Sequence, residues 1–225
     1  MSKLTVFLVE RIRRSLLASA GLLLFAFGFY LQLAGNVGLS PWPALNQGLA
    51  NHLPITFGQA SILVSVIIVV IDLLMHETIG IGTLLDAFLV GWGSDLFISL
   101  ELVPYQTEFI PGMAVLMIGL VASCLGQWLY MLAALSCGPR DSLLVGLGKR
   151  MPKLSIGTVN ILLTLAVALI AAVLGGQIGF GTILSLMCTG IIMDLVFKIV
   201  RFEPRSVTHE GLVETVQEFI KAAKG

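Results

Sequence analysis

Residues 79–96 read IGIGTLLDAFLVGWGSDL, and 99 positions later residues 178–195 read IGFGTILSLMCTGIIMDL. Further upstream the offset is 98, where Gly28 and Pro41 match Gly126 and Pro139. The second half of the chain therefore repeats the first. Repetition over nearly 100 residues decides the architecture before any single motif does.

Composition places the chain in a membrane. Hydrophobic residues make up 57% of it, charged residues only 12%, and the mean hydropathy is +0.99. An ordinary soluble domain has about 45–50% apolar and about 25% charged residues. The net charge is zero, and no basic stripe or zinc-ligand spacing is present, so we expect the lipid bilayer as the partner and no nucleic acid.

Six apolar stretches are long enough to cross about 30 Å of hydrocarbon as helices. The sequence predicts an all-α polytopic protein with spans at 15–34, 58–75, 83–102, 111–135, 156–174 and 182–200. Residues 1–14 form a basic amino terminus, 15–102 the first repeat, 111–202 the second repeat, and 203–225 an amphipathic tail. Three spans per copy force the second copy to be inverted relative to the first.

The distribution of Lys and Arg gives the orientation, because positive charge stays on the cytoplasmic side. Three groups of basic residues are expected there: Lys3, Arg11, Arg13 and Arg14; Arg140, Lys149, Arg150 and Lys153; and Lys198, Arg201 and Arg205. The segments 35–57, 101–110 and 175–181 contain no Lys or Arg. Both termini are therefore predicted to be cytoplasmic. Four crossings per copy would put Arg140 and Asp141 in the bilayer, which is costly.

The helical pattern is interrupted after the first span of each copy, and we call each interruption a break. The candidate site residues here are Asn36, Ser40 and Pro41 in one copy, and Gly138 and Pro139 in the other. Glycine ends a helix and proline suits the first turn of the next, so each break predicts a short helix of about ten residues. If these helices re-enter the membrane, their amino-terminal ends face a cavity suited to an anionic or polar solute. If they lie on the membrane surface, they are only connectors.

Two glycines and a threonine precede the third span of each copy: Gly80, Gly82 and Thr83, matched by Gly179, Gly181 and Thr182. Their amides form a candidate anion-binding nest. Simple capping of the following helix by the threonine explains the pattern as well.

Ionisable groups inside a span indicate function, because hydrocarbon makes them expensive. Asp86 and Asp95 lie in the third span, and Asp194 lies in the sixth. Asp86 and Asp95 are candidates for a proton or cation relay, and the sequence does not choose between them. Asp194 precedes Lys198 and Arg201, so it fits a structural ion pair as well as a transport role.

No nucleophile and base pair, metal-ligand pattern or cofactor motif is visible. Cys124, Cys137 and Cys188 occur singly in apolar or span-end positions. We therefore expect no enzyme activity, no cofactor and no bound metal.

The chain resembles the YczE/YitT group of bacterial integral membrane proteins. The resemblance rests on Gly35–Trp42 after the first span, on Gly80–Thr83, and on the spacing of Gly91 and Asp95. It covers residues 12–203 and implies a bacterial inner-membrane protein, without catalytic residues to transfer.

These observations favour a transporter of a small polar or anionic solute, with proton coupling as an option and the solute site between the repeats. The alternative is a non-catalytic membrane scaffold that acts through partner contacts. A channel is not distinguished from a carrier, and the sequence leaves a homo-oligomer open.

Overall fold

The computed structural model describes residues 3–202 and 211–224. In that part of the chain the helices are α1 (Lys3–Gly35), α2 (Pro41–His52), α3 (Phe57–Leu74), α4 (Ile81–Leu100), α5 (Phe109–Leu132), α6 (Pro139–Arg150), α7 (Ile156–Val173), α8 (Phe180–Val200) and α9 (Leu212–Lys224). The same part contains no strand. The predicted all-α class is confirmed, whereas Arg205 and the start of the tail lie outside the described residues.

Six of these helices are long and apolar enough to cross a membrane: α1, α3, α4, α5, α7 and α8. The protein is thus a multi-pass membrane protein with the predicted number of spans. The expected ends of the third and fourth spans, at residues 102 and 135, are too late. Glu101 and Ala134 adopt left-handed backbone angles, with φ of 46° and 53°, which end α4 and α5 earlier.

Each half of the chain has the same order of elements, namely one long helix, one short helix and two long helices. The short helices α2 and α6 have 12 residues each, close to the predicted length. α1 packs along α5, while α2 packs on α7 and α3 on α6, so each short helix contacts a long helix of the other half. How the two halves sit relative to a membrane stays a prediction.

Glycines let α1 and α5 approach closely. They recur every seven residues along both helices: Gly21, Gly28 and Gly35 on α1, and Gly112, Gly119 and Gly126 on α5. A Cβ atom on Gly28 would lie 2.6 Å from the Gly119 oxygen, and one on Gly126 would lie 2.6 Å from the Gly21 oxygen. Small residues at such a seam allow backbone-to-backbone packing in a membrane.

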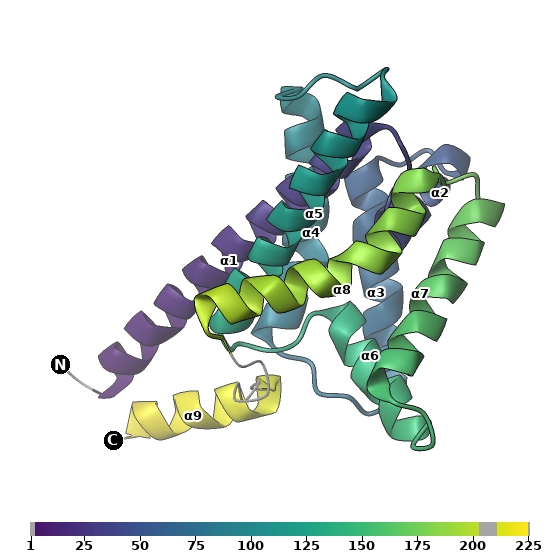
Figure 1. Cartoon of the computed structure of the whole chain (residues 1–225). Helices are drawn as coiled ribbons and strands as arrows, with labels where there is room; N and C mark the ends of the chain where they lie inside the picture. Colours follow the sequence, from purple (N-terminus) through teal and green to yellow (C-terminus); the bar gives the residue numbers. More distant parts are fainter. Residues whose placement is uncertain (1–2, 203–210, 225) are drawn as a thin grey trace.

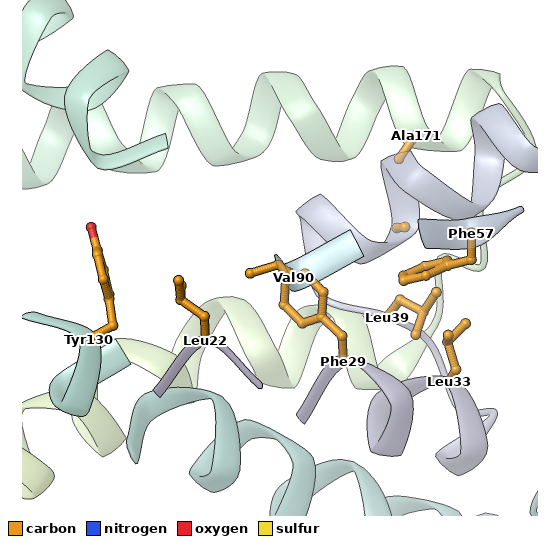
Figure 2. Packing of buried hydrophobic residues seen from close by; sticks show 9 residues of the cluster. Leu22, Phe29, Leu33, Leu39, Phe57, Val90, Tyr130 and Ala171 are labelled. Atoms are coloured by element: carbon orange, nitrogen blue, oxygen red, sulfur yellow. The ribbon is translucent and has the colours of Figure 1, made fainter. Parts of the chain in front are cut away.

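The main apolar core joins both halves. Figure 2 shows Leu22, Phe29 and Leu33 of α1 packed with Val90 of α4 and Phe57 of α3. Tyr130 of α5 and Ala171 of α7 belong to the same cluster. α1 therefore forms the central element, on which parts of both halves are assembled.

The two halves differ in how their last two helices pack. α3 and α4 pack against each other, whereas α7 and α8 barely touch. In Figure 1 α7 and α8 diverge from their connection toward the end of the molecule where both termini lie. α9 packs beside the first turns of α1, where Arg11 Nη2 lies 2.7 Å from Glu218 Oε2.

Candidate functional site

A cavity of about 760 Å³ lies between the two halves. Both short helices begin at it: Ser40, Pro41 and Trp42 line it from one side, and Gly138 and Arg140 from the other. Each short helix has proline in its first turn and an extended cap residue before it. The first amides of a helix have no partner within the helix, so the start of a helix carries partial positive charge.

Side chains of the preceding long helices fix these two starting points. Gln32 Oε1 of α1 accepts hydrogen bonds from the Ser40 hydroxyl at 2.6 Å and from the Ser40 amide at 3.3 Å. In the second half, the Gly138 amide donates to the hydroxyl of Tyr130 on α5. Gln32 and Tyr130 are equivalent positions of the repeat, 98 residues apart. In both halves, therefore, a side chain at the same repeat position accepts a hydrogen bond from the cap residue of the short helix. The acceptor is an amide oxygen in the first half and a phenol hydroxyl in the second.

The guanidinium of Arg140 lies between two aromatic rings. Its Cζ atom is 5.3 Å from the ring centroid of Phe29 and 5.2 Å from that of Trp42. Trp42 and Arg140 are themselves equivalent residues of the two copies. The contact thus joins the first turns of α2 and α6.

Arg140 lacks hydrogen-bond partners. Its Nε and Nη2 atoms are fully buried, and neither has a partner in the described part of the chain. No carboxylate there lies within the 4.0 Å of an ion pair with it. A guanidinium offers five N–H donors, so its capacity to bind an anion is largely unused.

Two carboxyl groups line the same cavity. Asp86 of α4 lies against Gly138, where a Cβ atom would collide with its Oδ2 atom. Asp141 is the neighbour of Arg140 on α6. Asp86 and its repeat equivalent Ser185 both line the cavity, so the acid is present in only one copy. The site contains one permanent cation and two groups that can carry protons.

The rest of the lining comes mostly from α1, α5, α7 and α8. Its apolar members include Phe25, Leu120, Leu165, Leu186, Met187 and Met193, and its polar members include Ser123, Asn160, Thr164 and Thr189. An apolar cavity with a few converging polar groups is typical of a small-molecule site.

Of the predicted site residues, Ser40, Pro41, Asp86 and Gly138 line this cavity. Pro139 is buried in the first turn of α6 without lining it. Asn36 lies elsewhere, where its Nδ2 atom donates to the Gln106 oxygen at 3.0 Å. The structure thus brings together the two breaks and one of the three acids.

The two Gly-Gly-Thr turns lie outside the cavity and join the halves. Thr83 donates through its hydroxyl to the Cys137 oxygen at 2.7 Å, at the break before α6. Gly181 donates through its amide to the Val37 oxygen at 2.9 Å, at the break before α2. Each turn therefore supports the break of the other half.

Amides of these turns are already bonded. The Gly80 amide donates to Thr83 Oγ1 at 3.2 Å, and the Gly179 amide donates to Thr182 Oγ1 at 3.1 Å. The remaining glycine of the set, Gly82, is packed against Ser136. This bonding favours the capping alternative over an anion nest.

Asp95 and Asp194 also lie away from the cavity. Asp95 Oδ1 accepts a hydrogen bond from the Gly58 amide at 2.7 Å, and its Oδ2 accepts one from the Thr56 hydroxyl, so Asp95 binds the start of α3. Asp194 is exposed on α8, and the described residues include no ion pair between it and Lys198 or Arg201.

Trp42, Tyr130 and Arg140 are site residues that the sequence patterns do not single out. The charge pattern groups Arg140 with Lys149 on the cytoplasmic side, and that placement stays a prediction. In the structure Arg140 lies in the first turn of α6 and lines the cavity. The available signal is the position of Arg140, directly after Pro139 in the first turn of a short helix.

Comparison with known proteins places the chain among bacterial membrane proteins. It is 34% identical over 176 residues to the uncharacterized membrane protein YczE of Bacillus subtilis (strain 168), covering 77% of this chain and 80% of the relative. It is 30% identical over 184 residues to an uncharacterized protein of Haemophilus influenzae, covering 80% of this chain and 83% of that protein.

A third relative, the uncharacterized protein YyaS of Bacillus subtilis, is 29% identical over 186 residues, covering 80% of this chain and 90% of the relative. No solved structure matches the chain. The resemblance to the YczE group is confirmed. A family model described as a family of unknown function (DUF6198) matches residues 12–198, and the chain belongs to that family.

Proposed function

We propose that this protein transports a small organic anion, which binds to Arg140 in the cavity between the two halves. The observation that carries the proposal is the Arg140 guanidinium, whose Nε and Nη2 atoms are buried and have no partner in the described part of the chain. We further propose that it works in the bacterial inner membrane with both termini cytoplasmic, and that it has no enzyme activity.

The energetics of a buried cation favour an anionic ligand. Two aromatic rings stabilise the Arg140 guanidinium by about 0.5–2 kcal/mol each. The carboxyl groups of Asp86 and Asp141 in the same cavity balance its charge, but neither forms an ion pair with it, so its buried N–H groups keep their desolvation cost. A carboxylate or phosphate oxygen would meet the free N–H groups with charge-assisted hydrogen bonds. The starts of α2 and α6 add partial positive charge at the same place.

The apolar walls narrow the class of anion. Phe25, Leu120, Leu165 and Met187 would be left facing a fully polar ion. An organic acid with an apolar body matches both the cation and these walls, since burial of apolar surface adds to its affinity.

Asp86 is the residue that we propose for proton coupling. Arg140 offsets only one of the two carboxylates in the cavity, so an entering anion adds to an existing negative charge. Protonation of Asp86 would remove that repulsion, and the anion and the proton would then move together.

The arrangement of the two halves is consistent with a carrier. We propose that they are inverted repeats, between which the solute site lies near the middle of the membrane. Short helices that start at such a site are a recurring feature of secondary transporters.

Binding is tested with benzoate and its neutral analogue benzamide. A variant with Trp92→Phe and Trp128→Phe keeps Trp42 as the reporter, because its ring touches Arg140. Benzoate should change Trp42 fluorescence, and benzamide should not. Arg140→Gln should weaken benzoate binding at least about tenfold, since hydrogen bonds to charged groups contribute about 1.5–3 kcal/mol.

The matched control is Lys153→Gln, which removes a cation from an exposed turn. Equal binding of benzoate and benzamide, or equal affinity in Arg140→Gln and the parent, would contradict the anion site.

Transport is tested by uptake of labelled benzoate into proteoliposomes. An inward proton gradient should drive uptake, and Asp86→Asn should abolish the gradient dependence while leaving benzoate exchange. Absence of uptake together with intact binding would favour the scaffold alternative.

A further inference from the structure

The structure contains a closing contact in one half and the same residues, apart, in the other half. In the first half the contact consists of Thr56, Gly58, Ile62, Gly91 and Asp95, which we call the first latch. Adding 99 to each number gives Ser155, Gly157, Ile161, Gly190 and Asp194, which we call the second latch. Four of the five residues are identical, and the fifth exchanges Thr for Ser.

The first latch is closed. The two glycines lie in direct contact, because a Cβ atom on either Gly58 or Gly91 would collide with the backbone oxygen of the other. Ile62 packs on Gly91. Asp95 binds the start of α3 through the Gly58 amide and the Thr56 hydroxyl. These contacts hold α3 and α4 together.

The second latch is open. Gly190 has no atom within 4 Å of an added Cβ, and for Gly157 the nearest atom lies 3.9 Å away, in Ser155 of its own turn. Both glycines and Ile161 line the cavity. The cavity therefore opens between α7 and α8, where the first half is sealed.

The start of α7 carries the same hydrogen-bonding groups as the start of α3. Ser155 caps α7 as Thr56 caps α3, by accepting a hydrogen bond from the amide three residues later. Asp194 is exposed and is not paired with Lys198 or Arg201. The same acceptor and the same donors are present in both halves, but only the first half has joined them.

We propose that Ser155, Gly157, Gly190 and Asp194 are positioning residues that close the cavity by forming in the second half the contact that α3 and α4 form in the first. The two latches alternate, so that the cavity opens on one side at a time. This inference rests on the proposed transport function, and it assigns Asp95 and Asp194 to the gates and not to the solute site.

The test measures distances between nitroxide labels in membranes, in a variant without the native cysteines. One pair of labels is at Leu63 and Trp92, beside the first latch, and the other is at Leu162 and Ile191, beside the second. The two pairs are equivalent in the repeat, and all four side chains are exposed. The first pair gives the reference distance for a closed latch.

The expected result is two populations for the Leu162/Ile191 pair, one of them at the short reference distance. Thr56→Val weakens the first latch and should enrich this short population in the second half, while a longer distance appears for Leu63/Trp92. Reciprocal changes are specific to alternating latches, because a merely structural role of Asp95 would not alter the distance in the other half.

Gly190→Leu should reduce the short Leu162/Ile191 population at least about tenfold. In the closed form the added side chain would collide with the start of α7, and overpacking of this kind destabilises that form by more than a tenfold change in population requires. No atom lies within 4 Å of an added Cβ at Gly190, so we expect the variant to fold in the open form. The control is Leu195→Phe, on an exposed part of the same helix.

A single long distance for Leu162/Ile191 in every variant, with or without benzoate, would overturn the latch. The label distances can be measured without any solute, so a failure of the latch is distinguishable from a failure of the anion site. Loss of benzoate binding with both distances present would refute the anion site and leave the latch standing.

Discussion

At the scale of single residues, the two equivalent acids Asp95 and Asp194 have different surroundings. Asp95 binds the start of α3, whereas Asp194 is exposed. Asp95→Ala leaves the Gly58 amide and the Thr56 hydroxyl without their acceptor, and we expect it to destabilise the protein by about 1–3 kcal/mol. Asp194→Ala should change stability by less than about 0.5 kcal/mol. Thermal unfolding in detergent compares the two, and equal losses would contradict the assigned contacts.

At the scale of elements, the seam between α1 and α5 depends on the absence of side chains. Gly28→Ala places a Cβ atom 2.6 Å from the Gly119 oxygen, and we expect a cost of about 1–3 kcal/mol. The control is the same substitution at Gly157, where an added Cβ fits, and there the higher helix propensity of alanine should stabilise by up to about 1 kcal/mol. The unfolding temperature measures both effects. A loss in Gly157→Ala equal to that in Gly28→Ala would mean that close approach is not the cause.

At the scale of the whole molecule, inversion of the two halves puts equivalent residues on opposite sides of the membrane. Thr56 and Ser155 are exposed caps of equivalent helices. In a variant without native cysteines, Thr56→Cys should react with a membrane-impermeant thiol reagent from outside the cell. Ser155→Cys should react only after the cytoplasmic side is opened. Labelling of both from one side would refute the inverted arrangement.

Much of the fold follows from local patterns. The apolar stretches give the number and approximate position of the spans, and proline after a Ser or Gly cap gives the starts of α2 and α6. Span ends are less predictable, because the left-handed turns at Glu101 and Ala134 carry no glycine to mark them. The site is predicted in part: Ser40, Pro41, Asp86 and Gly138 follow from caps and buried charge, whereas Arg140 is masked by its basic neighbours in sequence.

The sequence by itself determined the helical class, the six spans, the repeat and the family, because these depend on composition and on spacing along the chain. Only the tertiary structure decided which polar residues share a cavity. Trp42 and Arg140 meet because the first turns of α2 and α6, which are far apart in the sequence, lie side by side in the fold. Asp86 reaches the same place from a third helix, α4. The difference between the latches is also tertiary. Nearly identical residues are joined in one half and apart in the other, since the contact depends on how α7 and α8 are packed and not on their composition.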